Sequence, residues 1–433
     1  MHLHHTLAYF SDLVVVTDGQ VVVKEANFPI TELIIDSRNK PTTPFPIFFA
    51  IVGINHDGHD YIAAAYEKGI RQFVVVHPYH CVIIEKFNGV NILQVTNTLQ
   101  ALHQFIIFYR SKYQLPLLGI TGSNGKTIVK EWMHEFLSRK YKTVSNPQSY
   151  NSQVGVPLSI SLLQPSHEYG VFEAGIGQTG EMAKLAPLIQ PTHGLLTNIG
   201  PAHSQGFQSI IQKVEEKIKL FTSCTTIYYC KDHQLIHLAM VQLYGSTKVL
   251  VTWSFHNQKA DYRVYYKRLS NQTTLQITTT TQSNTFIIPF RDKASIENIT
   301  HCLVYLLDNG FDPGPLQRSL HQLTSIPMRM TLKAGIHRCQ IIDDTYTNDM
   351  VSLSIALDFM QQQQPKKRTA ILTDILQSAT SDDQLYQELA ALLAQHTIHR
   401  LIGIGPTISQ YKALFSIPET IFFNGIEDYL AQK

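Results

Sequence analysis

The stretch GITGSNGKT, at residues 119–127, constrains the fold of this chain more than any other feature. It follows the apolar run LPLLGI and precedes a segment, 126–140, whose apolar residues recur at three- and four-residue spacing. The residues of this stripe are Ile128, Val129, Trp132, Met133, Phe136 and Leu137. Such a stripe is typical of a helix with one buried face, so the glycines lie in a turn between a buried strand and a helix.

This turn has the chemistry of a phosphate cradle. A helix start presents unpaired backbone N–H groups and the positive end of its dipole, and glycines such as Gly122 and Gly125 let the backbone approach phosphate oxygens closely. Lys126 would supply a charge to the β- and γ-phosphates, and the Thr127 hydroxyl would ligate magnesium. The alternative is a glycine-rich turn with an exposed lysine.

The loop departs in one respect from the strict GxxxxGK[ST] pattern. That pattern places its first glycine at position 120, which is Ile120 here, and Gly119 and Gly122 flank the position instead. The strand before the loop and the helix after it still favour phosphate binding over a plain turn.

The rest of the chain alternates apolar, β-rich runs with amphipathic helical patterns. Examples are YGVFEAGI followed by 178–189, and HGLLTNIG followed by 208–221. This alternation predicts α/β layers around mainly parallel sheets. A polar stretch at 268–285 predicts strands or a loop at one edge of the middle region, and CQIIDDTYTND at 339–349 is expected to open a strand of a further domain.

The composition of the chain indicates which classes of molecule it binds. The 433 residues, 44% hydrophobic, have room for two or three domains with ordinary cores. Lys and Arg total 35 against 33 Asp and Glu, without a strong basic cluster, so we expect small-molecule partners, no nucleic acid and no membrane insertion. The N-terminus lacks signal-peptide features, which favours a cytoplasmic protein. The odd number of cysteines, five, indicates reduced packing residues, and HLHH near the start lacks the partners of a designed metal site.

GITGSNGKT also resembles the ATP-binding loop of the Mur ligases, which add amino acids to the cell-wall precursor. The likeness continues through YNSQVGVPLSI at 150–160, FEAGIGQTGEM at 172–182, TNIGPAHSQGF at 197–207 and IIDDTYTND at 341–349. These stretches are most similar to the branch that joins D-alanyl-D-alanine to UDP-N-acetylmuramoyl-tripeptide. DSR at 36–38 and the segment 48–75 resemble the UDP-sugar domain of that branch, so the likeness covers nearly the whole chain.

The resemblance implies a three-domain α/β architecture with a central P-loop-like parallel sheet and a Rossmann-like last domain. The expected domains are 1–107 for the UDP-sugar, 108–324 for ATP, and 325–433 as the closing ligase domain. It also implies an ATP-dependent amide ligase of peptidoglycan synthesis. The γ-phosphate of ATP would activate the peptide carboxylate as an acyl phosphate, and the amine of the dipeptide would attack it. Positioning of the substrates and neutralisation of phosphate charge would then account for most of the rate enhancement.

The same resemblance implies the site residues. ATP would be held by Gly122, Ser123, Asn124, Gly125, Lys126, Thr127, Asn298, Arg329 and Asp344, and the other substrate by Ser37, Arg38 and Asn151. Magnesium would be held by Thr127, Glu173, His203 and Lys217, and the catalytic residues would be Lys126, Lys217 and His203. Asn298 matches the adenine contact of the family.

Two of these metal ligands have ordinary alternatives. Glu173 ends the apolar run GVFE, where an ionised carboxylate without a partner would be costly, so a cation or a buried salt bridge is expected beside it. His203 follows a strand and a turn proline, and without its place in NIGPAH it would be a packed or surface histidine.

Lys217 falls where the family carries a lysine that reacts with carbon dioxide to form a carbamate. A carbamate would turn the cation into an oxygen ligand for a second magnesium ion. The residues themselves favour a plainer alternative, because a helix rich in charged side chains normally exposes them to solvent. The charged residues are Lys213, Glu215, Glu216, Lys217 and Lys219.

The chain departs from the family near its C-terminal end. The usual DDSYNANP is replaced by DDTYTNDM, with Thr347 at the place of an asparagine. In the family, a further strand, a KGSR-like turn and a closing helix follow the segment that resembles ETIFFNGIEDYLAQK. We therefore expect the domain to be incomplete, within a longer chain. DGHDYIAAAYEKGIRQFVV and LTDILQS are most similar to the subgroup in which this ligase is fused to an alanine racemase, so the resemblance implies that such a domain follows.

Three other functions are compatible with parts of the sequence. A folate- or amino-acid-polymerising ligase shares the central region, but such ligases lack the UDP-sugar domain that the front of this chain resembles. The other two functions are those of a P-loop kinase and of a degenerate ATP-binding protein that has kept the fold and lost turnover.

Overall fold

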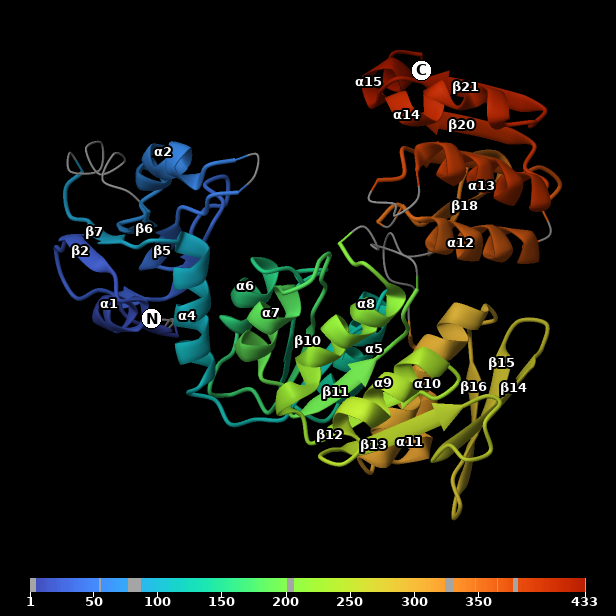
Figure 1. Ribbon diagram of the computed structural model, residues 1–433, viewed down its shortest axis with the longest axis horizontal. Helices are drawn as coiled ribbons and strands as arrows, with labels where there is room; N and C mark the ends of the chain where they lie inside the picture. Colours follow the sequence, from blue (N-terminus) through green and yellow to red (C-terminus); the bar gives the residue numbers. More distant parts are fainter. Residues whose placement is uncertain are drawn as a thin grey trace. The chain divides into compact units, whose positions relative to one another are not determined.

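The computed structural model describes residues 5–53, 56–76, 87–200, 206–323, 331–346, 348–363, 365–376 and 381–432 (Figure 1). The chain forms two compact units. The first comprises 1–119, 137–174 and 183–192, and the second comprises 120–136, 175–182 and 193–433. Within the described residues, no helix is long and apolar enough to cross a membrane.

The first unit contains a five-stranded sheet near the N-terminus. Its order is β2 (Gln20–Val23), β7 (Asn91–Gln94), β6 (Gln72–Val75), β5 (Pro46–Phe49) and β4 (Glu32–Ile34). Neighbours from β7 to β4 are parallel, whereas β2 is antiparallel to β7. Phe48, Phe73 and Ile92 are fully or almost fully buried between the sheet and helix α2 (Ile62–Glu67), which agrees with the apolar residues at the centres of these strands.

The remaining small elements of this region complete its core. They are β1 (Ala8–Tyr9), α1 (Phe10–Thr17), β3 (Pro29–Ile30) and the 3-10 helix Gly58–Tyr61. β1 pairs antiparallel with β3, and Phe10 and Leu13 of α1 are fully buried.

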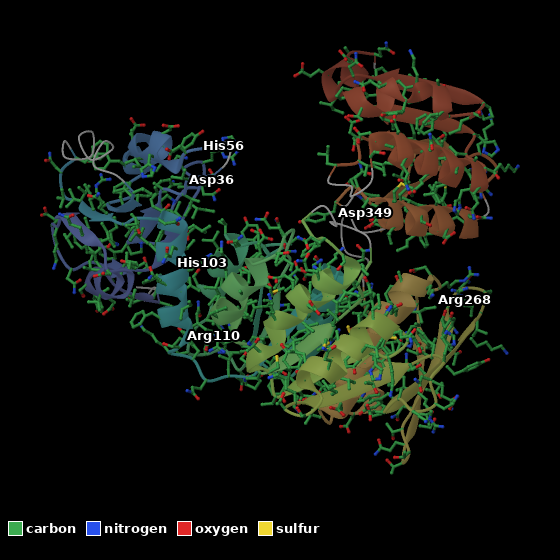
Figure 2. All side chains as sticks on the ribbon, viewed as in Figure 1. Asp36, His56, His103, Arg110, Arg268 and Asp349 are labelled. Atoms are coloured by element: carbon green, nitrogen blue, oxygen red, sulfur yellow. The ribbon has the colours of Figure 1, made fainter. Side chains whose placement is uncertain are left out.

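Helix α4 (Thr98–Arg110) is tied to distant segments of the same unit. Asn97 caps its first turn by accepting a hydrogen bond from the Gln100 N–H at 2.9 Å. His103 donates to the Gln153 carbonyl at 2.7 Å, and Arg110 donates to the Ile189 carbonyl at 2.9 Å (Figure 2). These buried polar contacts fix the helix at both its middle and its end.

A nine-stranded sheet forms the largest element of the chain. Its order is β16 (Ser283–Ile288), β15 (Thr273–Thr278), β14 (Tyr262–Arg268), β13 (Val249–Ser254), β12 (Thr226–Cys230), β11 (His193–Leu196), β8 (Leu117–Thr121), β10 (Tyr169–Glu173) and β9 (Thr143–Ser145). β9 is parallel to β10, and β11 to β14 pair in parallel. β14 to β16 form an antiparallel meander at one edge, which confirms the predicted edge strands in the polar stretch 268–285.

Helices connect the strands of this sheet. They are α5 (Lys126–Ser138), α6 (Gly155–Ile160), α7 (Glu181–Ile189), α8 (Ile210–Ile218), the 3-10 helix Lys219–Ser223, α9 (Gln234–Tyr244), α10 (Lys293–Asp308) and α11 (Pro313–Leu320). The helices expected over 126–140, 178–189 and 208–221 are confirmed, with ends shifted by a few residues. The predicted apolar stripe of α5 is buried. Its residues Val129, Met133 and Leu137 are fully inaccessible to solvent.

The C-terminal part of the second unit is a separate α/β layer. β17 (Thr331–Ala334) pairs antiparallel with β18 (Gln340–Asp343), the strand predicted within 339–349. β19 (Thr369–Thr373), β20 (Arg400–Ile404) and β21 (Glu419–Phe423) form a parallel sheet in that order. The accompanying helices are α12 (Met350–Gln362), α13 (Asp382–Gln395), α14 (Pro406–Gln410), the 3-10 helix Lys412–Leu414 and α15 (Ile426–Ala431), and a 3-10 turn, Ile336–Arg338, joins β17 to β18.

The described cysteines are free thiols. Cys224, Cys230 and Cys302 are buried, as expected of packing residues, whereas Cys339 is exposed. Cys81 lies outside the described residues. The domain boundaries after residues 107 and 324 stay a prediction.

Candidate active site

The loop between β8 and α5 has the backbone conformation that its glycines suggested. Gly122 has φ 148° and Gly125 has φ 80°, a region that side chains with a Cβ rarely adopt. Close approach requires glycine as well. A Cβ at 122 would lie 2.0 Å from Thr197 Oγ1, and one at 125 would lie 2.3 Å from Asn298 Oδ1. Any larger residue at either position would therefore push the loop off its neighbours.

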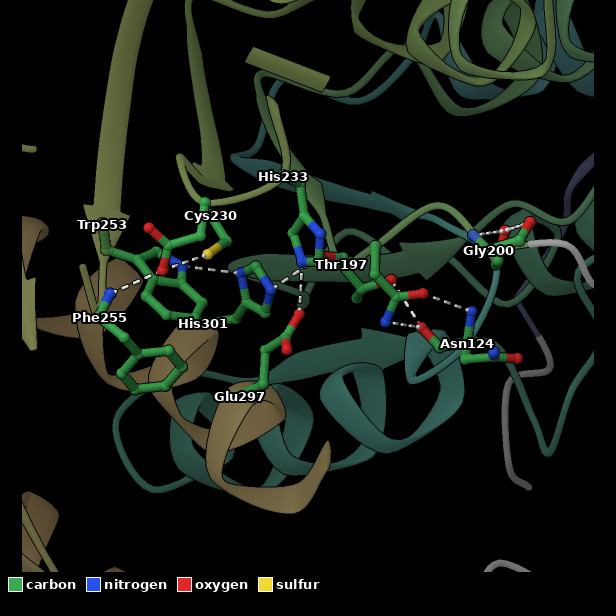
Figure 3. Close-up of polar contacts among 12 residues, drawn as sticks. Asn124, Thr197, Gly200, Cys230, His233, Trp253, Phe255, Glu297 and His301 are labelled. Atoms are coloured by element: carbon green, nitrogen blue, oxygen red, sulfur yellow. Dashed lines mark hydrogen bonds and ion pairs between the residues drawn. The ribbon is translucent and has the colours of Figure 1, made fainter. Parts of the chain in front are cut away.

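The segment that follows β11 holds the loop in place. Ser123 N–H donates to the Asn198 carbonyl at 2.7 Å, and Asn124 N–H donates to Asn198 Oδ1 at 3.1 Å. The Thr197 hydroxyl donates to the Asn124 carbonyl at 2.7 Å, and Gly200 N–H donates to Ser123 Oγ at 3.0 Å (Figure 3). Two segments far apart in the sequence thus share one hydrogen-bonded arrangement at the ends of their strands.

Three lysine side chains direct their ammonium groups to carbonyl oxygens of these two loops. Lys126 Nζ donates to the Ser123 carbonyl at 2.9 Å, Lys213 Nζ to the Gly200 carbonyl at 2.6 Å, and Lys217 Nζ to the Gly122 carbonyl at 3.1 Å. The loop is therefore surrounded by cationic groups from two helices, α5 and α8, which is an arrangement suited to a polyphosphate.

Burial and the repulsion between neighbouring ammonium groups lower the pKa values of two of these lysines. Burial, and after it the ammonium groups of Lys126 and Lys213, lowers the pKa of Lys217 well below its ordinary value. Burial and Lys126 lower the pKa of Lys213 to about 8, although Asp349 acts in the opposite direction. Because clustered like charges disfavour the protonated forms, a bound polyanion would relieve the repulsion.

The solvent-exposed alternative for helix α8 is wrong for its inner face. Lys213, Glu216 and Lys217 are at most 2% exposed, whereas Lys219 is half exposed and pairs with Glu216 at 2.6 Å. No function was predicted for Lys213. Its spacing of four residues from Lys217 places both on one face of the helix, which is the signal that would have found it.

Glu173 lies at the end of β10 and is fully buried. Its Oε1 accepts a hydrogen bond from Asn151 Nδ2 at 3.2 Å, and its backbone N–H donates to Asn146 Oδ1 at 2.6 Å. Two residues predicted for the site, one as a metal ligand and one for substrate, are therefore neighbours. A buried carboxylate with a neutral amide beside it could accept a cation.

The remaining predicted residues are distributed over the chain. Ser37 is buried, and the exposed Arg38 pairs with Asp36 at 2.7 Å, a contact that lowers the pKa of Asp36. Asn298 is buried on α10 against Gly125, and Asp344 follows β18 with partial exposure. His203, Arg329 and Thr347 lie outside the described residues. Among the residues that are described, no group of three or more His, Cys, Asp or Glu side chains could hold a metal ion.

Comparison with known proteins gives this geometry a context. Residues 120–306 match the Mur ligase middle domain. The UDP-N-acetylmuramoyl-tripeptide–D-alanyl-D-alanine ligase of Rickettsia prowazekii is 24% identical over 92% of this chain and 88% of its own length. The corresponding ligase of Bacillus subtilis is 26% identical over 83% of this chain and 77% of its own.

Solved structures agree over almost the whole chain. A crystal structure of MurF from Acinetobacter baumannii superposes with a TM-score of 0.82 at 22% identity, covering 98% of this chain and 91% of that one. The chain thus carries a Mur ligase middle domain and shares the fold of these ligases. MurF ligase from Thermotoga maritima, solved in complex with ADP, has a TM-score of 0.73 at 18% identity and covers 90% of this chain and 88% of that one. The matched middle domain begins within the glycine loop, so the loop belongs to the part of the chain that matches the Mur ligases.

Proposed function

We propose that this protein is an ATP-dependent ligase that joins D-alanyl-D-alanine to UDP-N-acetylmuramoyl-tripeptide, in the synthesis of the peptidoglycan precursor. One observation carries the proposal: a glycine loop surrounded by Lys126, Lys213 and Lys217, in a chain that spans most of the length of relatives with this activity in their names. The activity of these relatives supplies the substrates of the proposal, and the loop supplies the site for the triphosphate.

The reaction needs two group transfers. A carboxylate oxygen of the tripeptide attacks the γ-phosphorus of ATP, and the bond to the ADP oxygen breaks. The dipeptide amine then attacks the acyl carbon, phosphate leaves with the bonding electrons, and the amine gives up a proton. In this proposal Lys126 and Lys213 neutralise charge on the transferred phosphoryl group, and the glycine backbone fixes its position.

We also propose that magnesium is held by Thr127, Glu173, His203 and the modified side chain of Lys217. The buried Glu173 carboxylate and the buried Thr127 hydroxyl are oxygen donors of the kind that magnesium prefers. When bound, the ion would neutralise phosphate charge. The lowered pKa of Lys217 supports carbamate formation, because only the unprotonated amine can react with carbon dioxide.

The other predicted contacts belong to the same proposal. Ser37, Arg38 and Asn151 would bind the UDP-sugar peptide, and Asn298, Arg329 and Asp344 would bind the nucleotide. The enzyme would work in the cytoplasm, where ATP and UDP-sugars are made. The fusion to an alanine racemase stays a prediction, and the length of the native reading frame tests it.

A phosphate-release assay tests the activity. Turnover of ATP should require both UDP-N-acetylmuramoyl-tripeptide and D-alanyl-D-alanine, and the product should carry the new amide. Turnover with folate and glutamate would indicate the polymerising ligase instead. Phosphoryl transfer without amide formation would indicate a kinase, and nucleotide binding without turnover under any condition would indicate a protein that has lost catalysis.

A further inference from the structure

We propose that His301 is a positioning residue of the phosphate loop, acting through Thr197. The inference rests on the proposed function, because the loop is the part of the site that would hold ATP. His301 lies on α10 and is 1% exposed, and its side-chain hydrogen bonds join it to Trp253 and Thr197 rather than to the loop residues 122–126.

The two ring nitrogens of His301 have different partners. Trp253 Nε1 donates to His301 Nδ1 at 3.1 Å, and His301 Nε2 lies 3.1 Å from the Thr197 carbonyl oxygen (Figure 3). An indole N–H can only donate and a carbonyl can only accept. His301 is therefore the neutral tautomer with its proton on Nε2, which donates to Thr197.

Thr197 transmits this contact to the loop. Its backbone N–H donates to the Thr121 carbonyl at 3.0 Å, and its hydroxyl donates to the Asn124 carbonyl at 2.7 Å. Its Oγ1 also fills the space that a Cβ on Gly122 would need. The carbonyl held by His301 and the hydroxyl held by Asn124 belong to one fully buried residue, so a rotation of its peptide plane would displace the loop.

Helix α10 supports the loop at a second point one turn earlier. The Asn298 side chain lies against Gly125, and His301 follows three residues later on the same face. The helix therefore contacts the C-terminal end of the loop directly. It supports the N-terminal end of the loop through Thr197. Trp253, fully buried on β13, anchors the far side of His301.

Two substitutions separate the two bonds of His301. In His301→Gln, the amide nitrogen can replace Nε2 as donor to Thr197, at the cost of the Trp253 bond. In His301→Asn, the amide oxygen can replace Nδ1 as acceptor from Trp253, at the cost of the Thr197 bond. Each variant removes one buried hydrogen bond, so a purely structural role would give both the same loss of stability.

The proposal predicts different effects on nucleotide binding. His301→Asn should weaken ADP binding, measured by calorimetry, about tenfold and raise the KM for ATP about tenfold with a smaller change in kcat. His301→Gln should stay within about twofold of the wild type. Thr197→Val, which removes the hydroxyl and keeps the shape, should match His301→Asn, and the two substitutions together should add little.

Hydrogen exchange of the peptide that contains residues 122–127 provides a readout without nucleotide. His301→Asn should speed exchange of these amides, and His301→Gln should not. Equal exchange and equal ADP affinity in the two variants would overturn the proposal, and so would a failure of both to fold, since His301 would then support the fold rather than the loop. A wild-type protein that does not bind ADP, with loop exchange as expected, would contradict the proposed function and leave the positioning role standing.

Discussion

Lys126 is the first residue of α5, and its ammonium group lies over the loop against the Ser123 carbonyl. Lys126→Ala should therefore lower kcat/KM for ATP by at least about a hundredfold, because charge stabilisation of the transferred phosphoryl group is lost. The melting temperature should stay near that of the wild type. The exposed Lys184 provides a matched control, and Lys184→Ala should keep full activity. Wild-type turnover in Lys126→Ala would refute the assignment of this residue to phosphate.

Lys213 adds a cation that titrates near physiological pH. Its pKa of about 8 reflects burial and the Lys126 charge, with Asp349 opposing them. Deprotonation removes positive charge, so the affinity for ADP should fall as the pH rises from 7 to 9. Lys213→Met should weaken ADP binding about tenfold at pH 7 and flatten this pH dependence. Calorimetry at the two pH values measures both effects, and an unchanged pH dependence in the variant would exclude Lys213 as the group responsible.

Substitution of Lys217 tests whether a carbamate at this position is needed for activity. Lys217→Ala should abolish ligase turnover, and a small carboxylic acid should restore part of it by supplying an oxygen ligand. Mass spectrometry of the native protein under carbon dioxide should show the added carboxylate. If Lys217→Ala retains normal activity in buffer free of carbon dioxide, the carbamate is not needed.

At the scale of elements, helix α7 depends on a carboxylate from helix α8. Glu216 Oε1 accepts hydrogen bonds from the Gly180 N–H at 2.8 Å and the Met182 N–H at 3.2 Å, at the N-terminal end of α7. This is the capping that a helix start requires, supplied from a residue distant in sequence. The buried charge of Glu216 thus joins two helices that the sequence alone treats as independent.

Removing this cap should destabilise the fold. Glu216→Ala should lower the free energy of unfolding by about 2 kcal/mol, because the backbone N–H groups of Gly180 and the buried Met182 lose a charged acceptor. Urea denaturation measures the change. The neighbouring Glu215 is exposed, so Glu215→Ala should change the midpoint little. Equal midpoints for both variants would show that Glu216 does not carry the helix start.

The whole molecule should lose stability in mild acid, because burial lowers the pKa of several histidines. They are His103, His134, His193 and His301, and for His301 the pKa falls to about 4, with Glu297 opposing the shift and His233 adding to it. The unfolded chain binds more protons than the folded one between pH 4 and the ordinary value near 6.5. The free energy of unfolding should therefore decrease as the pH falls through this window.

For His301 alone, the decrease in the free energy of unfolding between pH 6.5 and pH 4 is on the order of 3 kcal/mol. Urea midpoints at pH 7, 6 and 5 should fall in that order. His301→Gln removes one titrating group and should make the decrease smaller. The same midpoint at pH 7 and pH 5 would contradict burial of these histidines in their neutral form.

Much of the fold and of the loop was predictable from local patterns. The apolar run before 122, the stripe along α5 and the placement of Lys126 and Thr127 after two glycines follow from periodicity and from the steric freedom of glycine. The edge strands within 268–285 were predictable because a polar run rich in threonine does not fit a buried parallel strand. These features depend on residues close together in the sequence.

The tertiary structure decided what lies around that loop. The sequence of α8 favours a charged helix in solvent, and only its packing against the glycine loop, the segment after β11 and the start of α7 buries Lys213, Glu216 and Lys217. His301 gave no signal at all, because its role comes from contacts with Trp253 and Thr197 that lie 48 and 104 residues away. Periodicity determines which face of an element is apolar, but burial, pKa shifts and hydrogen-bond partners depend on which distant elements meet that face.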